Sequence, residues 1–263
     1  MTAPWLLAHA HRVPQRDDVA TAVREGSAVV LRELPAPWRS LDGLSMVMLH
    51  VEEPDTAYDA RDMVPLNITV PDTISGSAPV RRRGFLSGRA AALLALSRHG
   101  IAAPDPIGIA GHRGPVWPHD VVGSITHTAG VAAAVVASAS AFRGIGLDVE
   151  PRMTTAVVAE VAPSVASEFL AGTVSLSDDG AARDDIVTAI FSAKESLFKC
   201  LRPLVDDFFD FSDARMLALH LAAGHGRLRV ERDLGGGVHA GSEFDVRLHV
   251  SGDRVHTLIT VAH

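Results

Sequence analysis

Three carboxylates and two ammonium groups stand in two short stretches of the sequence. Asp148 and Glu150 lie two residues apart in an apolar run, and Lys194, Glu195 and Lys199 lie in a second stretch. On a strand, Asp148 and Glu150 would leave the same face with Cα atoms about 6.5 Å apart. Two ionised carboxylates this close repel each other unless a cation joins them, and Mg²⁺ or Mn²⁺ suits such oxygen ligands. The pair therefore predicts a divalent-metal site beside a phosphate, with a solvated strand edge as the alternative.

The second stretch is predicted to be helical over 186–201. Its apolar residues recur at helical spacing, Pro203 ends the pattern, and Asp184 or Asp185 is placed to cap the first turn. At about 100° per residue, Lys194 falls inside the apolar arc. An ammonium there needs a partner, unless the side chain extends outward to solvent.

Glu195 and Lys199 share the edge of that arc. Their i,i+4 spacing is typical of a surface ion pair, which stabilises a helix by about 0.2–0.5 kcal/mol. The alternative is that this helix edge lines a cleft. In such a cleft Lys194 and Lys199 would meet an anion, and Glu195 would meet a metal or a proton.

Arg89 poses the same question on an earlier helix, predicted over 83–99 with Gly100 at its C-terminal end. Arg89 lies among the apolar residues of this helix, and Arg81 lies two turns earlier near the same face. A buried guanidinium pairs either with a phosphate, which suits its fork geometry, or with a core carboxylate. His127 lies on an apolar strand face, which suits a core histidine as well as a ligand. Together these groups describe a polyphosphate site with one metal.

The remaining sequence is expected to form mainly antiparallel sheet. Strict alternation over 244–250 indicates a sheet with one solvent-facing side, and Gly235–Gly237 indicates a hairpin loop rather than a phosphate cradle. Further strands are expected over 28–31, 46–51, 124–128, 131–137, 145–150 and 255–261, a weaker helix over 153–171, and loops over 62–79, 102–120 and 175–185. A short connection near 141–144 is the predicted boundary between two halves, residues 1–142 and 143–263.

Composition narrows the class of protein. With 263 residues, 47% of them hydrophobic, the chain can bury its own core. The single cysteine, Cys200, excludes an internal disulfide framework, favours a reducing, cytoplasmic compartment, and is expected to be a buried apolar side chain. A net charge of −7 argues against nucleic acid as a partner. No apolar stretch of about 18 residues predicts a membrane span, and no basic leader precedes Trp5–Ala8.

Four blocks in this order resemble the 4'-phosphopantetheinyl transferases, specifically the monomeric surfactin-type and enterobactin-synthase-type enzymes. The blocks are Arg81–Arg89, Gly111–Pro118 continuing into Gly123–His127, Ile145–Glu150 and Phe191–Lys199. They cover about half of the chain, and the last two are the most specific. The resemblance implies an α+β fold in which a pseudo-twofold pair of similar α/β halves, each with an antiparallel sheet, holds the cofactor in the groove between them.

The resemblance also implies a reaction, the transfer of the 4'-phosphopantetheine arm from coenzyme A to a serine of an acyl or peptidyl carrier protein. Mg²⁺ (or Mn²⁺) would be required and 3',5'-ADP released. Asp148, Glu150 and Glu195 would be the metal carboxylates, and Asp148, Glu195 and Lys199 would act in catalysis. Glu195 would be the base for the carrier serine, whereas Lys199 would hold the pyrophosphate and stabilise the leaving group. Lys194 would contact the cofactor.

The nucleotide end of coenzyme A would be bound by residues of the first two blocks. By resemblance these are Arg81, Arg89, Arg113, Thr126 and His127, with His127 and Arg113 near the 3'-phosphate. Arg113 stands where many relatives have lysine, which keeps the charge but changes its reach. Val149 offers no side-chain ligand, so a water or a backbone group would fill that metal position. The family further implies a cytoplasmic monomer that serves siderophore, polyketide or fatty acid synthesis.

Two other functions are compatible with parts of the sequence. Ile145–Asp148 resembles the first phosphate strand of the actin and sugar-kinase group, although Glu150–Pro151 stands where that group continues into a glycine-containing hairpin. A preference for ATP over coenzyme A would favour a nucleotide phosphotransferase of this kind. A non-catalytic carrier-binding module would lose nothing on Glu195→Gln, and the intact charged positions argue against it.

Overall fold

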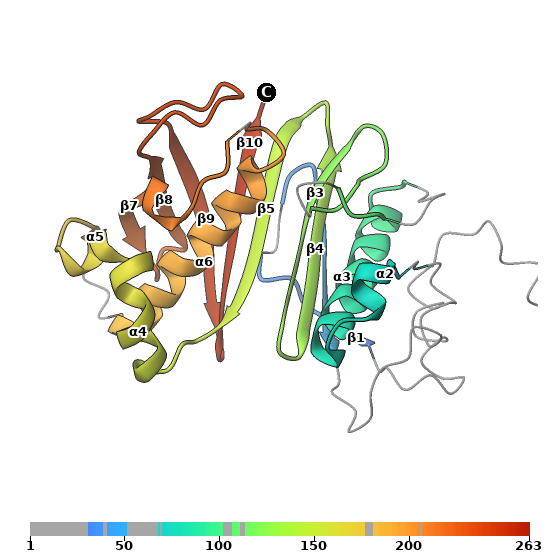
Figure 1. Cartoon of the computed structure of the whole chain (residues 1–263), viewed down its shortest axis with the longest axis horizontal. Helices are drawn as coiled ribbons and strands as arrows, with labels where there is room; N and C mark the ends of the chain where they lie inside the picture. Colours follow the sequence, from blue (N-terminus) through green and yellow to red (C-terminus); the bar gives the residue numbers. More distant parts are fainter. Residues whose placement is uncertain are drawn as a thin grey trace, which may run out of the picture.

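The computed structural model describes residues 31–38, 41–51, 68, 70–101, 107–110, 114–176, 181–205 and 207–263 (Figure 1). The predicted cofactor ligand Arg113 lies outside these residues, as do positions 28–30 of the first predicted strand. Within them the chain forms two antiparallel sheets, each with one long helix, and the predicted α+β class is confirmed.

The first sheet carries a 20-residue helix on one face. Its four strands are all antiparallel, in the order β1-β2-β4-β3. They are β1 (Leu31–Leu34), β2 (Leu44–Val51), β3 (Val121–Thr128) and β4 (Val131–Ser138). The short α2 (Asp72–Ser75) and the long α3 (Pro79–Arg98) precede β3, and α3 buries its apolar side chains against the sheet.

The second sheet has six strands in the order β5-β10-β9-β8-β7-β6, and only the β6–β7 pair is parallel. The strands are β5 (Phe142–Pro151), β6 (Ser175–Leu176), β7 (Ala214–His220), β8 (His225–Val230), β9 (Glu243–Ser251) and β10 (Arg254–Ala262). The helices are α4 (Thr155–Val165), α5 (Ser167–Leu170) and α6 (Arg183–Leu201), followed by the 3-10 turn η3 (Phe211–Asp213). In Figure 1, α6 crosses this sheet beside β5.

An apolar layer joins the two sheets. Met48 of β2, Leu147 of β5 and Leu258 of β10 belong to one buried cluster. Val149 is 0% exposed in the same cluster. Because successive side chains on a strand point to opposite faces, Asp148 points away from this layer, toward α6. The predicted boundary at 142/143 falls just after Phe142, the first residue of β5. The division into two halves stays a prediction.

The two long helices begin earlier than predicted, whereas the weaker helix predicted over 153–171 begins later, as α4 and α5. Helix α3 begins at Pro79, because proline suits the first turn of a helix, and Gly100 follows its end with a φ of +78°. The predicted capping role of Asp184 and Asp185 is wrong, because α6 begins at Arg183 with Ala182 as its N-cap. Both aspartates lie inside the first turn, where a carboxylate favours the positive end of the helix dipole.

Strands β2, β3, β4, β5, β9 and β10 were all predicted, with their ends displaced by a few residues. Strands β6 and β7 were not predicted, and β6 and α2 lie within segments predicted as loop. In β9, Val246 and Leu248 are buried whereas Asp245 and Arg247 are exposed, which confirms the predicted solvent-facing side. None of the helices in the described ranges is long and apolar enough to cross a membrane.

Candidate active site

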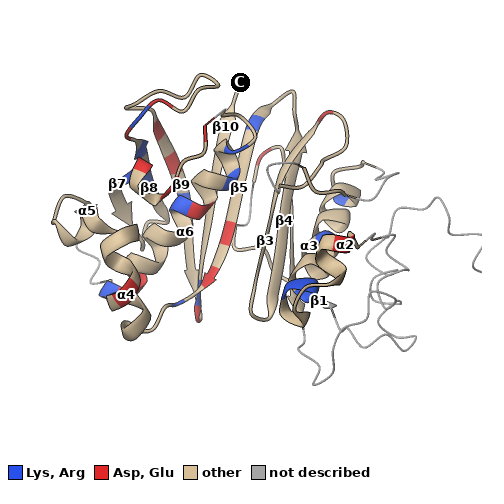
Figure 2. Cartoon of the chain, viewed as in Figure 1, with Lys and Arg blue, Asp and Glu red and all other residues tan. Residues whose placement is uncertain are grey.

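The candidate site lies where α6 approaches β5 and β3. A Cβ atom at Gly146 would fall 1.7 Å from the carbonyl oxygen of Ser196 on α6. A Cβ atom at Gly144 would fall 2.6 Å from the carbonyl oxygen of Cys200. Side chains at these two positions would push the helix away, so the glycines allow charged residues of α6 to lie beside the acidic positions of β5 (Figure 2).

Asp148 is at the centre of the site. It is only 2% exposed, and both of its carboxylate oxygens have partners. Lys199 Nζ lies 2.6 Å from Oδ1, and the Thr126 hydroxyl donates to the same oxygen over 3.1 Å. The Ser192 hydroxyl donates to Oδ2 over 2.8 Å. One ammonium and two hydroxyl groups therefore hold the ionised carboxylate in one orientation.

Lys199 links the two halves of the chain. Its ammonium donates to Thr126 Oγ1 of β3 over 3.2 Å and to the carbonyl oxygen of Leu147 over 3.3 Å. Glu195 and Lys199 both line a cleft of about 480 Å³ between β3, β5 and α6. The helix edge therefore faces a cleft, and Lys199 pairs with Asp148 rather than with Glu195.

The carboxylates near Lys199 alter one another's protonation. Burial, followed by repulsion from Asp148 and Glu195, raises the pKa of Glu150 to about 7, although Lys199 opposes the shift. Burial also raises the pKa of Glu195, with Lys199 opposing and Asp148 adding to the shift. Acids with raised pKa values in a cleft are suited to exchange protons or to take up a cation near neutral pH.

These three carboxylates fit a divalent cation in donor type and in charge, because they offer the oxygen ligands that Mg²⁺ binds and the charge of Asp148 raises the pKa of both Glu150 and Glu195. In the described part of the chain, no group of three or more His, Cys, Asp or Glu side chains is already arranged to hold an ion. Asp148 is instead directed to Lys199 and Ser192. Metal binding by Asp148, Glu150 and Glu195 stays a prediction.

Lys194 lies in a different environment from Lys199. It is 4% exposed, and its ammonium lies 2.9 Å from Glu168 Oε1 and 3.1 Å from the carbonyl oxygen of Phe211. Glu168 is also 4% exposed, and its Oε1 accepts the backbone N–H of Met216 over 3.0 Å. The charge inside the apolar arc is thus balanced by a buried carboxylate of α5. These contacts give no support to the predicted cofactor contact of Lys194, which stays a prediction.

Arg89 is buried too, but its partners are backbone groups. Its Nε donates to the carbonyl oxygen of Ile107 over 2.8 Å, and its Nη2 donates to that of Gly108 over 2.9 Å. The guanidinium stacks on the Phe85 ring at 4.6 Å from the centroid, and burial lowers the pKa of Arg89 to about 10. These contacts include no carboxylate. The buried charge of Arg89 is therefore compensated by backbone carbonyl oxygens of the segment that leads toward β3.

The remaining predicted nucleotide ligands occupy different positions. His127 packs so closely on α3 that a Cβ atom at Gly84 would fall 2.6 Å from its ring. Although His127 reaches solvent, burial, together with the positive charges of Lys199 and Arg89, lowers its pKa. Lys199 and Arg89 thus place positive charge near His127, and the charge of Asp148 opposes it. Arg81 is exposed near the start of α3, about 12 Å along the helix from Arg89.

Four polar residues that contact the site or its helix were not predicted from the sequence. They are Glu168, Ser192, Ser196 and Thr257. Ser192 and Ser196 lie in the predicted motif at i,i+4 spacing, so their position on one helix face was a usable signal. The expectation for Cys200 is confirmed, because it is fully buried and burial raises its pKa to about 12.

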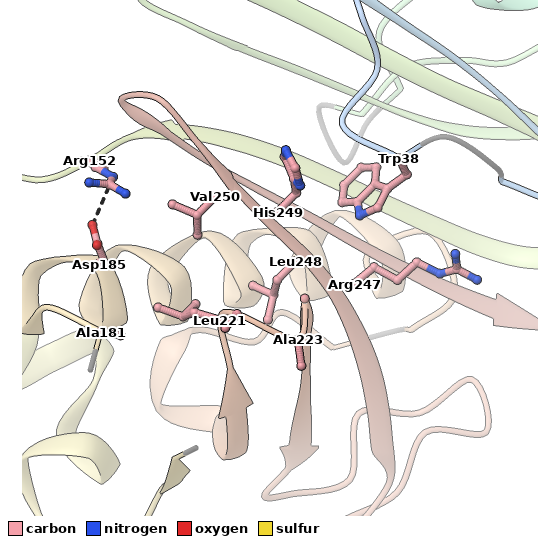
Figure 3. A pocket seen from close by; sticks show the side chains of 12 residues that line it. Trp38, Arg152, Ala181, Asp185, Leu221, Ala223, Arg247, Leu248, His249 and Val250 are labelled. Atoms are coloured by element: carbon pink, nitrogen blue, oxygen red, sulfur yellow. Dashed lines mark ion pairs between the residues drawn. The ribbon is translucent and has the colours of Figure 1, made fainter. Parts of the chain in front are cut away.

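Two further hollows differ in their relation to this site. One of about 180 Å³ adjoins Glu195 and is lined by the aromatic residues Phe198, Phe208, Phe209 and Phe211. A larger one of about 750 Å³ lies beside β9 and the turn between β7 and β8 (Figure 3). Trp38, His249 and the Arg152–Asp185 ion pair line this larger hollow, and no predicted site residue does. Chemistry rather than size therefore identifies the 480 Å³ cleft as the candidate active site.

Comparison with known proteins identifies the family of the chain. Residues 71–137 match the 4'-phosphopantetheinyl transferase N-terminal domain, and residues 144–246 match the 4'-phosphopantetheinyl transferase superfamily. The two matches lie on the two sheets and include every predicted site residue.

Curated relatives carry the same family name. The chain is 37% identical over 148 residues to 4'-phosphopantetheinyl transferase Svp of Streptomyces mobaraensis, covering 54% of this chain and 57% of the relative. It is 37% identical over 145 residues to 4'-phosphopantetheinyl transferase Npt of Nocardia iowensis, covering 54% and 62%. It is 36% identical over 132 residues to enterobactin synthase component D of Escherichia coli K12, covering 50% and 60%. The matched part thus spans less than two thirds of each relative's length. With both family models matched in chain order, the chain belongs to the 4'-phosphopantetheinyl transferase superfamily.

Proposed function

We propose that this chain transfers 4'-phosphopantetheine from coenzyme A to a serine of an acyl or peptidyl carrier protein, releasing 3',5'-ADP. The observation that carries the proposal is the contact of Lys199 with Asp148 at a cleft that also presents Glu195. Phosphoryl transfer needs positioning and charge neutralisation more than covalent chemistry, and these groups supply both.

The proposed reaction breaks one bond of the pyrophosphate and forms one bond to the carrier. Glu195 takes the proton of the carrier serine, whose oxygen forms a new P–O bond to the phosphorus that bears the pantetheine arm. The P–O bond to the 3',5'-ADP phosphate breaks, and the electron pair leaves with the nucleotide. The raised pKa of Glu195 suits a base, because a more basic carboxylate takes up a proton more readily. Lys199 moves from Asp148 to stabilise the charge on the leaving phosphate.

Asp148, Glu150 and Glu195 would hold one Mg²⁺ (or Mn²⁺), which when bound supplies charge neutralisation at the pyrophosphate. The positive charge that Lys199 and Arg89 place near His127 suits the 3'-phosphate of the nucleotide. The aromatic hollow beside Glu195 suits an apolar part of the substrate. We further propose that the protein acts as a monomer in the cytoplasm, on carriers of siderophore, polyketide or fatty acid synthesis.

The proposal is tested by mixing the protein with coenzyme A, Mg²⁺ and a panel of apo carrier proteins, and measuring carrier mass. A gain of one phosphopantetheine arm is expected, and no gain with any carrier would contradict the proposal. Glu195→Gln should lose the activity, whereas the exposed Glu160→Gln should keep it. If Glu195→Gln keeps its full activity, Glu195 is not the base for the carrier serine. Tighter binding of ATP than of coenzyme A would favour the nucleotide phosphotransferase instead.

A further inference from the structure

A row of three buried hydroxyl groups lies directly behind Asp148. Ser192, Ser196 and Thr257 are each 0% exposed. Thr257 Oγ1 lies 2.9 Å from Ser192 Oγ and 2.7 Å from Ser196 Oγ, and the Ser192 hydroxyl reaches Asp148 Oδ2 over 2.8 Å. The row therefore runs without a gap from the interior of the second half to the carboxylate.

The direction of the hydrogen bonds follows from counting protons. A carboxylate accepts hydrogen bonds, so the single hydroxyl proton of Ser192 is donated to Asp148 Oδ2. The Ser192 oxygen can then accept from Thr257, and the Thr257 oxygen can accept from Ser196. Thr257 and Ser196 also donate to backbone oxygens, those of Ser192 over 2.9 Å and of Thr257 over 3.1 Å. In the order Ser196, Thr257, Ser192, Asp148, the donations that run along the row point toward the carboxylate and polarise one another.

Register places Thr257 in this row. It is the direct partner of Asp148 in the antiparallel pairing of β10 with β5, so both side chains leave the same face of the sheet. Ser192 and Ser196 stand one turn apart on α6, above that face. Because Gly146 lets the helix come so close, short hydroxyl side chains suffice to span the distance.

We propose that Thr257, supported by Ser196, is a positioning residue that orients Asp148 through Ser192. Thr257 fixes the Ser192 hydroxyl, which commits Oδ2 to the protein interior. Oδ1 remains the oxygen that contacts Lys199, which lines the cleft, and by this proposal it is the oxygen available to a cation. Thr257 lies beyond the segment matched by the superfamily, which ends at residue 246. The catalytic meaning of this positioning role rests on the proposed function. The hydrogen-bond geometry does not depend on that function.

The test is the affinity of the full chain for Mn²⁺ alone, read from the electron paramagnetic resonance signal of the free ion. Thr257→Val keeps a β-branched residue of similar shape and removes the hydroxyl. It is expected to weaken Mn²⁺ binding about 10- to 100-fold, as loss of an outer-shell partner does at metal sites. Thr257→Ser restores the hydroxyl and should bind within about threefold of wild type. Asp148→Asn shows that the measured ion sits at this carboxylate.

Thr260→Val is the matched control, because it removes a threonine hydroxyl from the same strand but outside the row. Its Mn²⁺ affinity should equal that of wild type. Ser196→Ala, a second variant, should weaken binding in the same direction, and it serves if Thr257→Val does not fold by circular dichroism. Wild-type affinity in both folded variants, or no Mn²⁺ binding by wild type, would overturn the inference.

Transfer kinetics separate this inference from the proposed function. Thr257→Val should raise the Mg²⁺ concentration that gives half-maximal transfer and leave KM for the carrier unchanged. If wild type binds Mn²⁺ through Asp148 but modifies no carrier, the proposed function fails while the positioning role stands. If wild type transfers the arm and Thr257→Val responds to Mg²⁺ as wild type does, the positioning role fails alone.

Discussion

Lys199 Nζ lies 2.6 Å from Asp148 Oδ1, so the ammonium of α6 and the buried carboxylate of β5 form an ion pair at the cleft. Of the 24 lysine and arginine residues in the chain, only Lys194 and Lys199 are lysines. Both lie on α6 and both contact a buried carboxylate, whereas the rest of these 24 residues are arginines. A compact ammonium fits a narrow space between helix and strand that a planar guanidinium would not.

Replacing Lys199 by methionine should separate its two proposed roles. Transfer should fall about 10²- to 10³-fold in kcat, because a charge that stabilises the leaving phosphate is lost. Mn²⁺ binding without coenzyme A should become about tenfold tighter, since the competing positive charge beside Asp148 is removed. Weaker Mn²⁺ binding by Lys199→Met would contradict competition for Oδ1. Unchanged kcat would contradict the phosphate role.

Amine-selective acetylation should distinguish the two lysines. The side chain of Lys199 is 27% exposed, whereas that of Lys194 is 3% exposed and paired with Glu168. Brief treatment should therefore acetylate Lys199 well before Lys194, as read by peptide mass spectrometry. Coenzyme A should protect Lys199, because the proposed phosphate contact covers its ammonium. Equal rates at both lysines would show that Lys194 is accessible, contrary to its burial.

The pKa of Glu150 predicts how the stability of the metal-free protein depends on pH. An acid whose pKa rises from 4.5 to about 7 on folding stabilises the fold below pH 4.5 and loses that contribution as pH rises through 7. At about 1.4 kcal/mol per pKa unit, and after discounting for partial exposure, the loss is about 2 kcal/mol by pH 8. Urea denaturation in EDTA between pH 5 and pH 8 measures it.

Glu150→Gln isolates this contribution from other titrating groups. The variant should be more stable than wild type at pH 8 by about 2 kcal/mol and nearly equal at pH 4.5. Mg²⁺ should stabilise wild type at pH 8 and have little effect on the variant, because the predicted ligand is missing. A variant that gains no stability at pH 8 would show that the repulsion from Asp148 and Glu195 is relieved by other means.

Local patterns predicted much of the fold. Alternation in β9, helical spacing in α3 and α6, and the glycine after α3 are properties of neighbouring residues, and the structure confirms each element. The same holds for the placement of Asp148 on the face opposite Val149, because strand parity follows from the sequence. The buried charges of Arg89 and Lys194 were also identified from helix geometry alone.

The partners of those charges were not predictable in the same way. Glu168 of α5 meets Lys194 of α6 across 26 residues of sequence, and Thr257 meets Ser192 because β10, paired with β5, packs against α6. Such contacts depend on how distant elements pack, which no local pattern records. Arg89 shows the same limit, because its carbonyl partners come from an irregular segment that has no periodicity.

The Lys194–Glu168 pair should behave as a coupled buried unit. Removing one charge leaves the other uncompensated, so Lys194→Met and Glu168→Gln should each cost about 3–5 kcal/mol of unfolding free energy. The double variant should cost at least about 2 kcal/mol less than the sum of the single variants, because it leaves neither charge uncompensated. The amide oxygen that replaces the Glu168 carboxylate can still accept the Met216 N–H. The partly exposed Arg152–Asp185 pair, replaced by Met and Asn, is the control and should show a coupling below about 1 kcal/mol.

Coenzyme A binding to the same double variant decides between a structural and a cofactor role for Lys194. If Lys194 only compensates Glu168, the folded double variant should keep the wild-type KM for coenzyme A. The hydrogen-bond partners of the ammonium are Glu168 and the carbonyl oxygen of Phe211. If Lys194 leaves Glu168 to bind the cofactor, KM should rise about tenfold or more while stability stays restored. Additive losses of stability would instead contradict the buried pair itself, whatever the value of KM.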